Sequence, residues 1–174
     1  MGELLIKNFL LGIMLFTSIT FAQDTTHTGI DTKTGRSILL GLYDRTAFQD
    51  SNYAWWFNSG YKFYSPDTNV INKLSSVNFD SISITIVMGT WCSDSRREVP
   101  RFFKITDLLK FPESKINIIG VNRGFANDKG YLSLLHIKHV PTFIFYKNKN
   151  ELGRIIETPE VSLESDMLKI LKKD

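Results

Sequence analysis

The chain has 174 residues, of which 43% are hydrophobic and 22% charged, which is the size and composition of a single globular domain. Its 21 Lys and Arg and 18 Asp and Glu give a net charge of +3, and the basic residues are scattered, so no basic stripe for nucleic-acid binding is present. The chain contains one cysteine, Cys92, which excludes an intramolecular disulfide and leaves packing alone to stabilise the fold.

Residues 1–22 have the pattern of an export signal. Lys7 supplies a short positive start, residues 9–19 are mostly apolar, and Ala22 is the small residue expected at a cleavage site. The apolar stretch is too short to span a bilayer as a helix. We therefore expect cleavage after Ala22 and a periplasmic or extracellular protein; an uncleaved N-terminal anchor is the alternative.

Residues 23–65 are predicted to form an N-terminal extension packed on the core. Residues 24–35 are polar and predict a flexible lead-in, and residues 38–42 are a short apolar run. An aromatic block follows whose members recur every three or four residues, which predicts one face of a helix. Such a face docks an extension onto a core more often than it grips a ligand. Its members are Tyr53, Trp56, Phe57, Tyr61 and Tyr64.

Residues 66–174 alternate between helical and strand patterns. We expect helices over 66–77, 93–111, 131–137 and 160–172, and strands over 82–88, 116–121, 142–146 and 152–157. Strands joined by helices are expected to be parallel, and the two joined by the short polar turn "KNKN" antiparallel. The prediction is an α/β fold with a central mixed sheet flanked by helices.

Three motifs within this region resemble the thioredoxin superfamily. In "GTWCSDSRREVP", Trp91 and Cys92 lie between the first strand and its helix, and Pro100 follows eight residues after the cysteine. The segment "HVPTFIFYKNKN" carries a proline before a strand and a Lys-Asn turn after it. The resemblance covers residues 66–174 and implies a thioredoxin-like fold.

The resemblance also implies a groove beside the cysteine. The Val140–Pro141 bond is expected to be cis and to face Cys92, which leaves the backbone of Val140 to pair with an extended peptide, next to Thr142 at the strand start. Trp91 would flank this groove. An exported, single-cysteine chain with an aromatic extension looks like the thioredoxin-family proteins of Bacteroidetes-type bacteria.

The position of Cys92 predicts a reactive thiol. A thiolate at a helix N-terminus faces free backbone N–H groups and the positive end of the helix dipole, which favours the ionised form. Arg96 and Arg97, in the first turn, would add positive potential if they point towards the sulfur. Asp94 acts against the thiolate, and His139, near the expected groove, is a further candidate to tune its charge.

Two departures from the family pattern restrict this chemistry. Ser95 stands where the resemblance implies a resolving cysteine; its hydroxyl can donate a hydrogen bond to the thiolate but cannot attack a disulfide. Ile86 stands where classical members carry a buried acid that helps to move protons, and Asp94 replaces a frequent proline. A mixed disulfide on Cys92 would therefore need a thiol from outside the chain for its release.

We predict a thiol–disulfide oxidoreductase-like protein that acts through Cys92 by forming mixed disulfides, as an isomerase or a relay. Its partners would be protein or small-molecule thiols and disulfides, or a second copy linked through Cys92. No cofactor and no metal are expected, because His136 and His139 form only a common H-x-x-H spacing beside a single cysteine. The alternative is a redox-inactive binding module that uses the proline groove for peptides.

Overall fold

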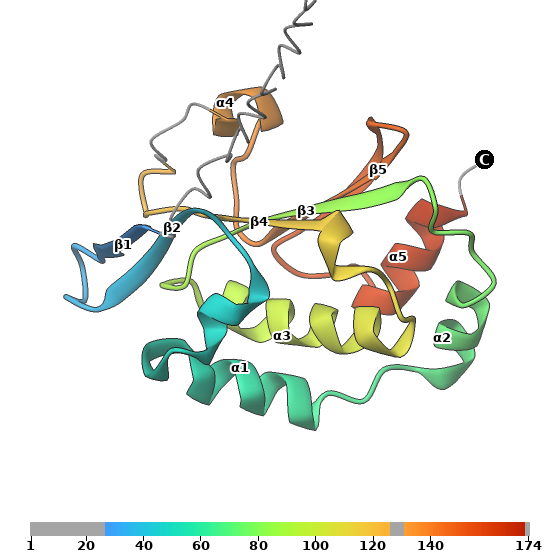
Figure 1. The fold of residues 1–174 in the computed structure, drawn as a ribbon, viewed down its shortest axis with the longest axis horizontal. Coiled ribbons are helices and arrows are strands. Elements are labelled where there is room, and N and C mark those ends of the chain that lie inside the picture. Colours follow the sequence, from blue (N-terminus) through green and yellow to red (C-terminus); the bar gives the residue numbers. More distant parts are fainter. Residues whose placement is uncertain (1–26, 126–130, 173–174) are drawn as a thin grey trace, which may run out of the picture.

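The protein is described by a computed structural model that covers residues 27–125 and 131–172. A six-stranded sheet forms its centre, in the order β1-β2-β4-β3-β5-β6, with helices on both faces (Figure 1). No helix in these two ranges is long and apolar enough to cross a membrane. The predicted export signal, residues 1–22, lies outside the described residues.

The elements follow the predicted alternation from β3 onward. The strands are β1 (His27–Ile30), β2 (Ser37–Tyr43), β3 (Ile82–Met88), β4 (Ile116–Gly120), β5 (Thr142–Lys147) and β6 (Asn150–Ile156). The helices are α1 (Ser51–Phe63), α2 (Thr68–Leu74), α3 (Ser93–Leu108), α4 (Tyr131–Leu135) and α5 (Leu163–Leu171), with 3-10 turns over Arg45–Gln49 and Glu113–Lys115. The segment from β3 to α5 has a thioredoxin-like topology, so the predicted fold class is confirmed.

One strand direction differs from the expectation. β4 is parallel to β3, but β5, which follows α4, is antiparallel to β3. The register explains why: Gly120 at the end of β4 pairs with Met88, and Thr142 at the start of β5 pairs with Val87. The connection through α4 thus stays at one end of the sheet. The prediction that helix-joined strands are parallel is wrong for β5.

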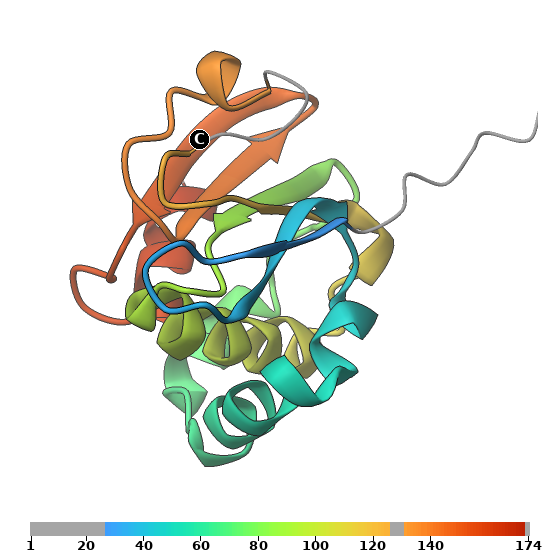
Figure 2. The same ribbon diagram turned by 90° about the vertical axis from the view of Figure 1, so that its left-hand side faces the viewer.

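The N-terminal extension contributes two strands as well as a helix. The expectation of a flexible lead-in is wrong for residues 27–35, because β1 pairs antiparallel with β2 across a turn that begins at Asp31. Gly35 has a φ of 68° in this turn, a conformation that favours glycine. β2 then pairs antiparallel with β4, where Gly41 lies opposite Gly120 (Figure 2).

The predicted aromatic face of the extension is buried against α3. Tyr53, Trp56 and Phe57 are each at most 6% exposed. Phe48, from the 3-10 turn before α1, stacks on Phe57 with 4.7 Å between ring centroids. α1 runs alongside α3 on the same side of the sheet (Figure 1). Aromatic packing of this kind makes the extension part of the main hydrophobic core.

A polar contact reinforces the same interface. Arg45 pairs with Asp107 of α3 at 2.9 Å, and the hydroxyl of Tyr61 on α1 donates to the other carboxylate oxygen at 2.8 Å. The Arg45 guanidinium also lies 4.8 Å from the ring centroid of Phe103. Charge and ring contacts together fix the α1–α3 crossing.

The sheet separates two apolar clusters. In β3, Ile84, Ile86 and Met88 face the larger cluster, which includes residues of α1, α3 and α5. Val87 faces the opposite side, under α4. The smaller cluster contains Val87, Ile119, Val121, Leu132 and Val140.

The closest approach of α1 to α3 generates a stability prediction. A Cβ atom on Gly60 would lie 2.6 Å from Cγ of Pro100, whose ring cannot rotate away. We expect Gly60→Val to lower the free energy of unfolding by about 1–3 kcal/mol, measured by urea denaturation. Ser59→Val, on the exposed side of the same helix, is the matched control and should change it by less than about 0.5 kcal/mol. Equal stability of the two variants would contradict this packing.

Candidate active site

Three chain segments meet at one edge of the sheet. β3 and β4 end there, and β5 begins there, as the pairs Met88–Gly120 and Val87–Thr142 show. Cys92 follows β3 by four residues, Arg123 follows β4 by three, and Pro141 directly precedes β5. The reversed direction of β5 therefore brings the proline to the cysteine.

The thiol of Cys92 faces the proline segment. Cys92 is the N-cap residue of α3, with φ −86° and ψ 131°, and it is partly exposed. Its sulfur donates a hydrogen bond to the carbonyl oxygen of Val140 at 3.2 Å. The Val140–Pro141 bond is cis, as the sequence predicts. Val140 and Thr142 are buried, at 3% and 2% exposed, and the carbonyl of Val140 is occupied by the hydrogen bond from Cys92.

Trp91 is fixed on the β4 side of the cysteine. Its indole N–H donates to the carbonyl oxygen of Val121 at 2.8 Å. A Cβ atom on Gly89 would lie 2.5 Å from the indole, so this close approach requires glycine. The guanidinium of Arg123 lies 4.6 Å from the ring centroid of Trp91. Trp91 is therefore contacted by Gly89 from its own loop and by Val121 and Arg123 from the loop after β4.

Arg123 is in turn bound by Asp31 of the β1–β2 turn. Two hydrogen bonds, at 2.7 and 3.0 Å, make the pair bidentate, and Asp31 is only 2% exposed. The hydrogen bond from Arg123, helped by one from Thr34, holds the pKa of Asp31 well below its usual range, although burial acts in the opposite direction. The bond to Asp31 raises the pKa of Arg123, and attraction to nearby Cys92 acts in the same direction.

Sequence reasoning missed both members of this pair. Asp31 was placed in a flexible lead-in, and Arg123 was not assigned a role. A signal for Asp31 existed, because "DTKTG" between an apolar run and a short Thr-rich segment is typical of a hairpin turn. No local pattern links Arg123 to it, since the two residues are 92 positions apart.

The predicted modulators Asp94 and Arg97 bind each other. Their ion pair has a distance of 2.8 Å, and Arg97 also contacts the buried carboxylate of Glu98 at 2.5 Å. Arg97 is therefore engaged with carboxylates, whereas Arg123 is close enough to Cys92 for an electrostatic interaction.

Two predicted site residues have described partners other than the sulfur. Ser95 is fully buried, and its hydroxyl oxygen accepts a hydrogen bond from the backbone N–H of Gly89 at 3.3 Å; within the described residues no hydrogen bond joins it to Cys92. The imidazole of His139 is 56% exposed and lies 3.3 Å from Glu157. The influence of either side chain on the Cys92 thiolate therefore stays a prediction.

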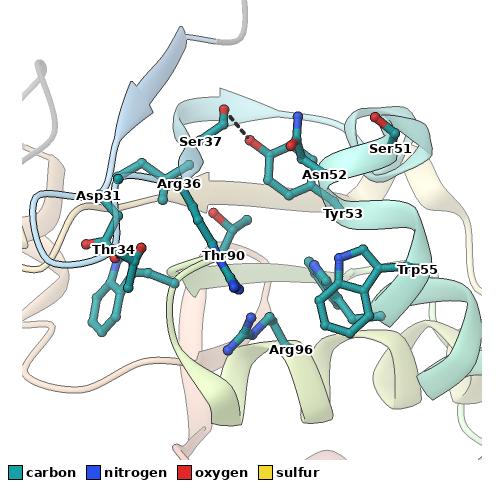
Figure 3. Close-up of a pocket in the computed structure, with 14 residues that line it drawn as sticks. Asp31, Thr34, Arg36, Ser37, Ser51, Asn52, Tyr53, Trp55, Thr90 and Arg96 are labelled. Carbon is teal, nitrogen blue, oxygen red and sulfur yellow. Dashed lines mark hydrogen bonds between the residues drawn. The ribbon is translucent and has the colours of Figure 1, made fainter.

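A cavity of about 600 Å³, shown in Figure 3, is lined in part by Trp91. The β1–β2 turn, α1 and the first turn of α3 enclose it. Arg96, the remaining predicted modulator, lines this cavity. No group of three or more His, Cys, Asp or Glu side chains suited to a metal ion occurs among residues 27–125 and 131–172.

Comparison with known proteins supports the fold alone. No family model and no curated protein matches the chain. A solved protein of unknown function from Pseudomonas aeruginosa is 16% identical over 76% of this chain and 92% of its own, with a TM-score of 0.58. An HIV epitope-scaffold is 15% identical over 77% and 94%, with a TM-score of 0.59. Thioredoxin O2 from Arabidopsis thaliana is 22% identical over 58% and 85%, with a TM-score of 0.41.

The Asp31–Arg123 pair generates a pH prediction. The folded-state pKa of Asp31 is below the ordinary value of about 4, so the stability that the pair adds is present at neutral pH and is lost as the pH falls below about 4. We expect Asp31→Asn to lower the urea midpoint at neutral pH and the difference from wild type to shrink in acid. Urea titrations across this pH range measure it.

The control is a double-mutant cycle. In an Arg123→Gln background, the stability loss caused by Asp31→Asn at neutral pH should be much smaller and should no longer shrink to the same extent in acid, because the main partner that lowers the pKa of Asp31 is gone and only the hydrogen bonds from Thr34 and Lys33 oppose the effect of burial. A difference between wild type and Asp31→Asn that stays constant into strong acid would contradict the assignment.

Proposed function

We propose that the protein carries out thiol–disulfide exchange through Cys92 as a single nucleophile. The Cys92 thiolate attacks one sulfur of a partner's disulfide, forms a new sulfur–sulfur bond and releases the partner's other sulfur as a thiolate. A second thiolate, from the same partner or from a small thiol, then attacks the mixed disulfide and restores Cys92. Each step breaks one sulfur–sulfur bond and forms another, so the exchange requires no electron transfer to a cofactor.

The observation that carries this proposal is the position of the sulfur. Cys92 is partly exposed at the start of α3 and lies 3.2 Å from the carbonyl oxygen of Val140, next to the cis proline. A thiolate there faces the free N–H groups of the helix and has the Arg123 cation nearby. The partly exposed thiol offers a partner's disulfide a point of attack beside the cis proline.

The surroundings of Ser95 support a monothiol mechanism. Ser95 occupies the position one helical turn after Cys92, and its hydroxyl oxygen is bound to Gly89. Ile86 is fully buried in the main core and has no proton to give. Neither side chain can release a mixed disulfide, so release depends on a thiol supplied by the partner or by the medium.

The setting we propose is outside the cytoplasm. Residues 1–22 would direct export, and an exported environment holds the protein disulfides on which such a thiol acts. The partners would be protein or small-molecule thiols and disulfides, including a second copy joined through Cys92.

Substitution of Ser95 tests the monothiol mechanism. We expect wild type to form one mixed disulfide with a chromogenic aromatic disulfide and to stall until a small thiol is added. Ser95→Cys places a second thiol one turn away, so it should release the mixed disulfide by closing an internal disulfide. The gain in turnover should be partial, because Ile86 cannot shuttle a proton. Mass spectrometry of the intact protein distinguishes the free, mixed and internally bridged forms.

The matched control is Ser93→Cys, which adds a thiol to the exposed residue beside Cys92 but not one turn away. Failure of Ser95→Cys to close an internal disulfide would show that the assigned geometry is wrong. Failure of wild type to form any mixed disulfide, with Cys92→Ser equally inert, would favour the binding module that uses the groove without redox chemistry.

A further inference from the structure

We propose that the cavity between the β1–β2 turn, α1 and the start of α3 binds a small organic anion. Its acidic group, a carboxylate or a phosphate, would lie between Arg36 and Arg96, and its flat apolar part would lie against tryptophan rings. This site lies beside the thiol and does not include it: Cys92 is not among the lining residues, whereas Trp91 borders both places.

The charge of the cavity is the first argument. Five of the seven arginines form ion pairs with carboxylates: Arg45, Arg97, Arg101, Arg123 and Arg154. Arg36 and Arg96 form none with a described residue, and both line this cavity. Figure 3 shows their guanidinium groups directed into the same space from two different elements. Two cations brought together without an anion repel each other, and a bound acidic group would relieve that repulsion.

The acidic and hydroxyl groups of the lining do not neutralise the two arginines. Asp31 is the one carboxylate among the described lining residues, and it is held by Arg123 in a bidentate pair. Ser37 and Tyr53 share a hydrogen bond of 3.0 Å, and the hydroxyl of Thr90 accepts one from the backbone of Leu39 at 3.2 Å. The charged donors left over for a ligand are therefore the two guanidinium groups, which match carboxylate and phosphate oxygens.

The walls of the cavity are the second argument. All three tryptophans of the chain line it: Trp55, Trp56 and Trp91. Trp56 is 6% exposed and forms part of the core, whereas Trp55 is 63% exposed, which is unusual for so large an apolar side chain. Aromatic faces of this kind stack on flat apolar groups.

The volume of the cavity is suited to a small molecule. Its volume of about 600 Å³ lies within the range of roughly 300–1,000 Å³ that is usual for small-molecule sites. A molecule with one ring and one acidic group fits this space and uses both features of the lining.

The test uses tryptophan fluorescence, because all three tryptophans of the chain line this cavity; Trp91 also borders Cys92, so the variants below locate the signal. The probes are phenyl phosphate and phthalate, which carry a ring and a phosphate or carboxylates. Phenol lacks the charge, and inorganic phosphate lacks the ring. We expect saturable changes with one or both of the charged aromatic probes, and at least about tenfold weaker binding of phenol and of inorganic phosphate.

Variants locate the binding. Arg36→Gln and Arg96→Gln should each raise the dissociation constant about tenfold or more, because each removes a charged hydrogen-bond donor. Lys73→Gln removes the same charge from α2, outside the cavity, and should leave it within about twofold. Cys92→Ser should bind like wild type, so the result does not depend on the exchange reaction.

Three results would overturn the proposal. They are the absence of saturable binding by both charged aromatic probes, equal binding of inorganic phosphate and phenyl phosphate, and equal weakening by Lys73→Gln and Arg96→Gln. Calorimetry and circular dichroism of each variant separate lost binding from lost folding.

Discussion

The ion pair between Asp31 and Arg123 joins three parts of the chain that are far apart in sequence. Asp31 belongs to the turn between β1 and β2, Arg123 to the loop after β4, and the Arg123 guanidinium lies over the ring of Trp91, directly before Cys92. Because Asp31 is almost fully buried, its charge requires a partner, and Arg123 supplies it in bidentate geometry. The pair therefore couples the N-terminal hairpin to the position of the thiol.

Trp91 divides the surface around this pair into two environments. On the β5 side, the sulfur of Cys92 lies against the carbonyl oxygen of Val140 beside the cis proline. On the β2 side, Arg96 lines an aromatic cavity that exists only because the extension folds back onto α3. Since Arg96 follows Cys92 by one helical turn, a ligand in the cavity and a partner on the sulfur would be close neighbours.

Much of the fold could be predicted because its signals are local. The β-branched run of β3 and the helical spacing in α3 identify their elements without tertiary information, and Trp91, Cys92 and Pro141 identify the edge where the site lies. The β1 strand was missed because it is short and polar, and β1 gains its stability by pairing with β2. The direction of β5 and the partner of His139 were missed because they depend on contacts between residues farther apart in sequence, such as Glu157 with His139.

We propose that the fold makes Cys92 a nucleophile. Because the chain contains one cysteine, the reactivity of this thiol in the folded protein can be compared directly with its reactivity in the unfolded chain. The direct measurement is the rate of alkylation of Cys92 by iodoacetamide at mildly acidic pH, in the folded protein and in the urea-unfolded chain. Cys92 lies at the N-terminus of α3 and Arg123 interacts with it, a setting typical of reactive cysteines, so we expect the folded protein to react faster and Arg123→Gln to reduce the advantage. A folded thiol that reacts no faster than the unfolded one would contradict the account.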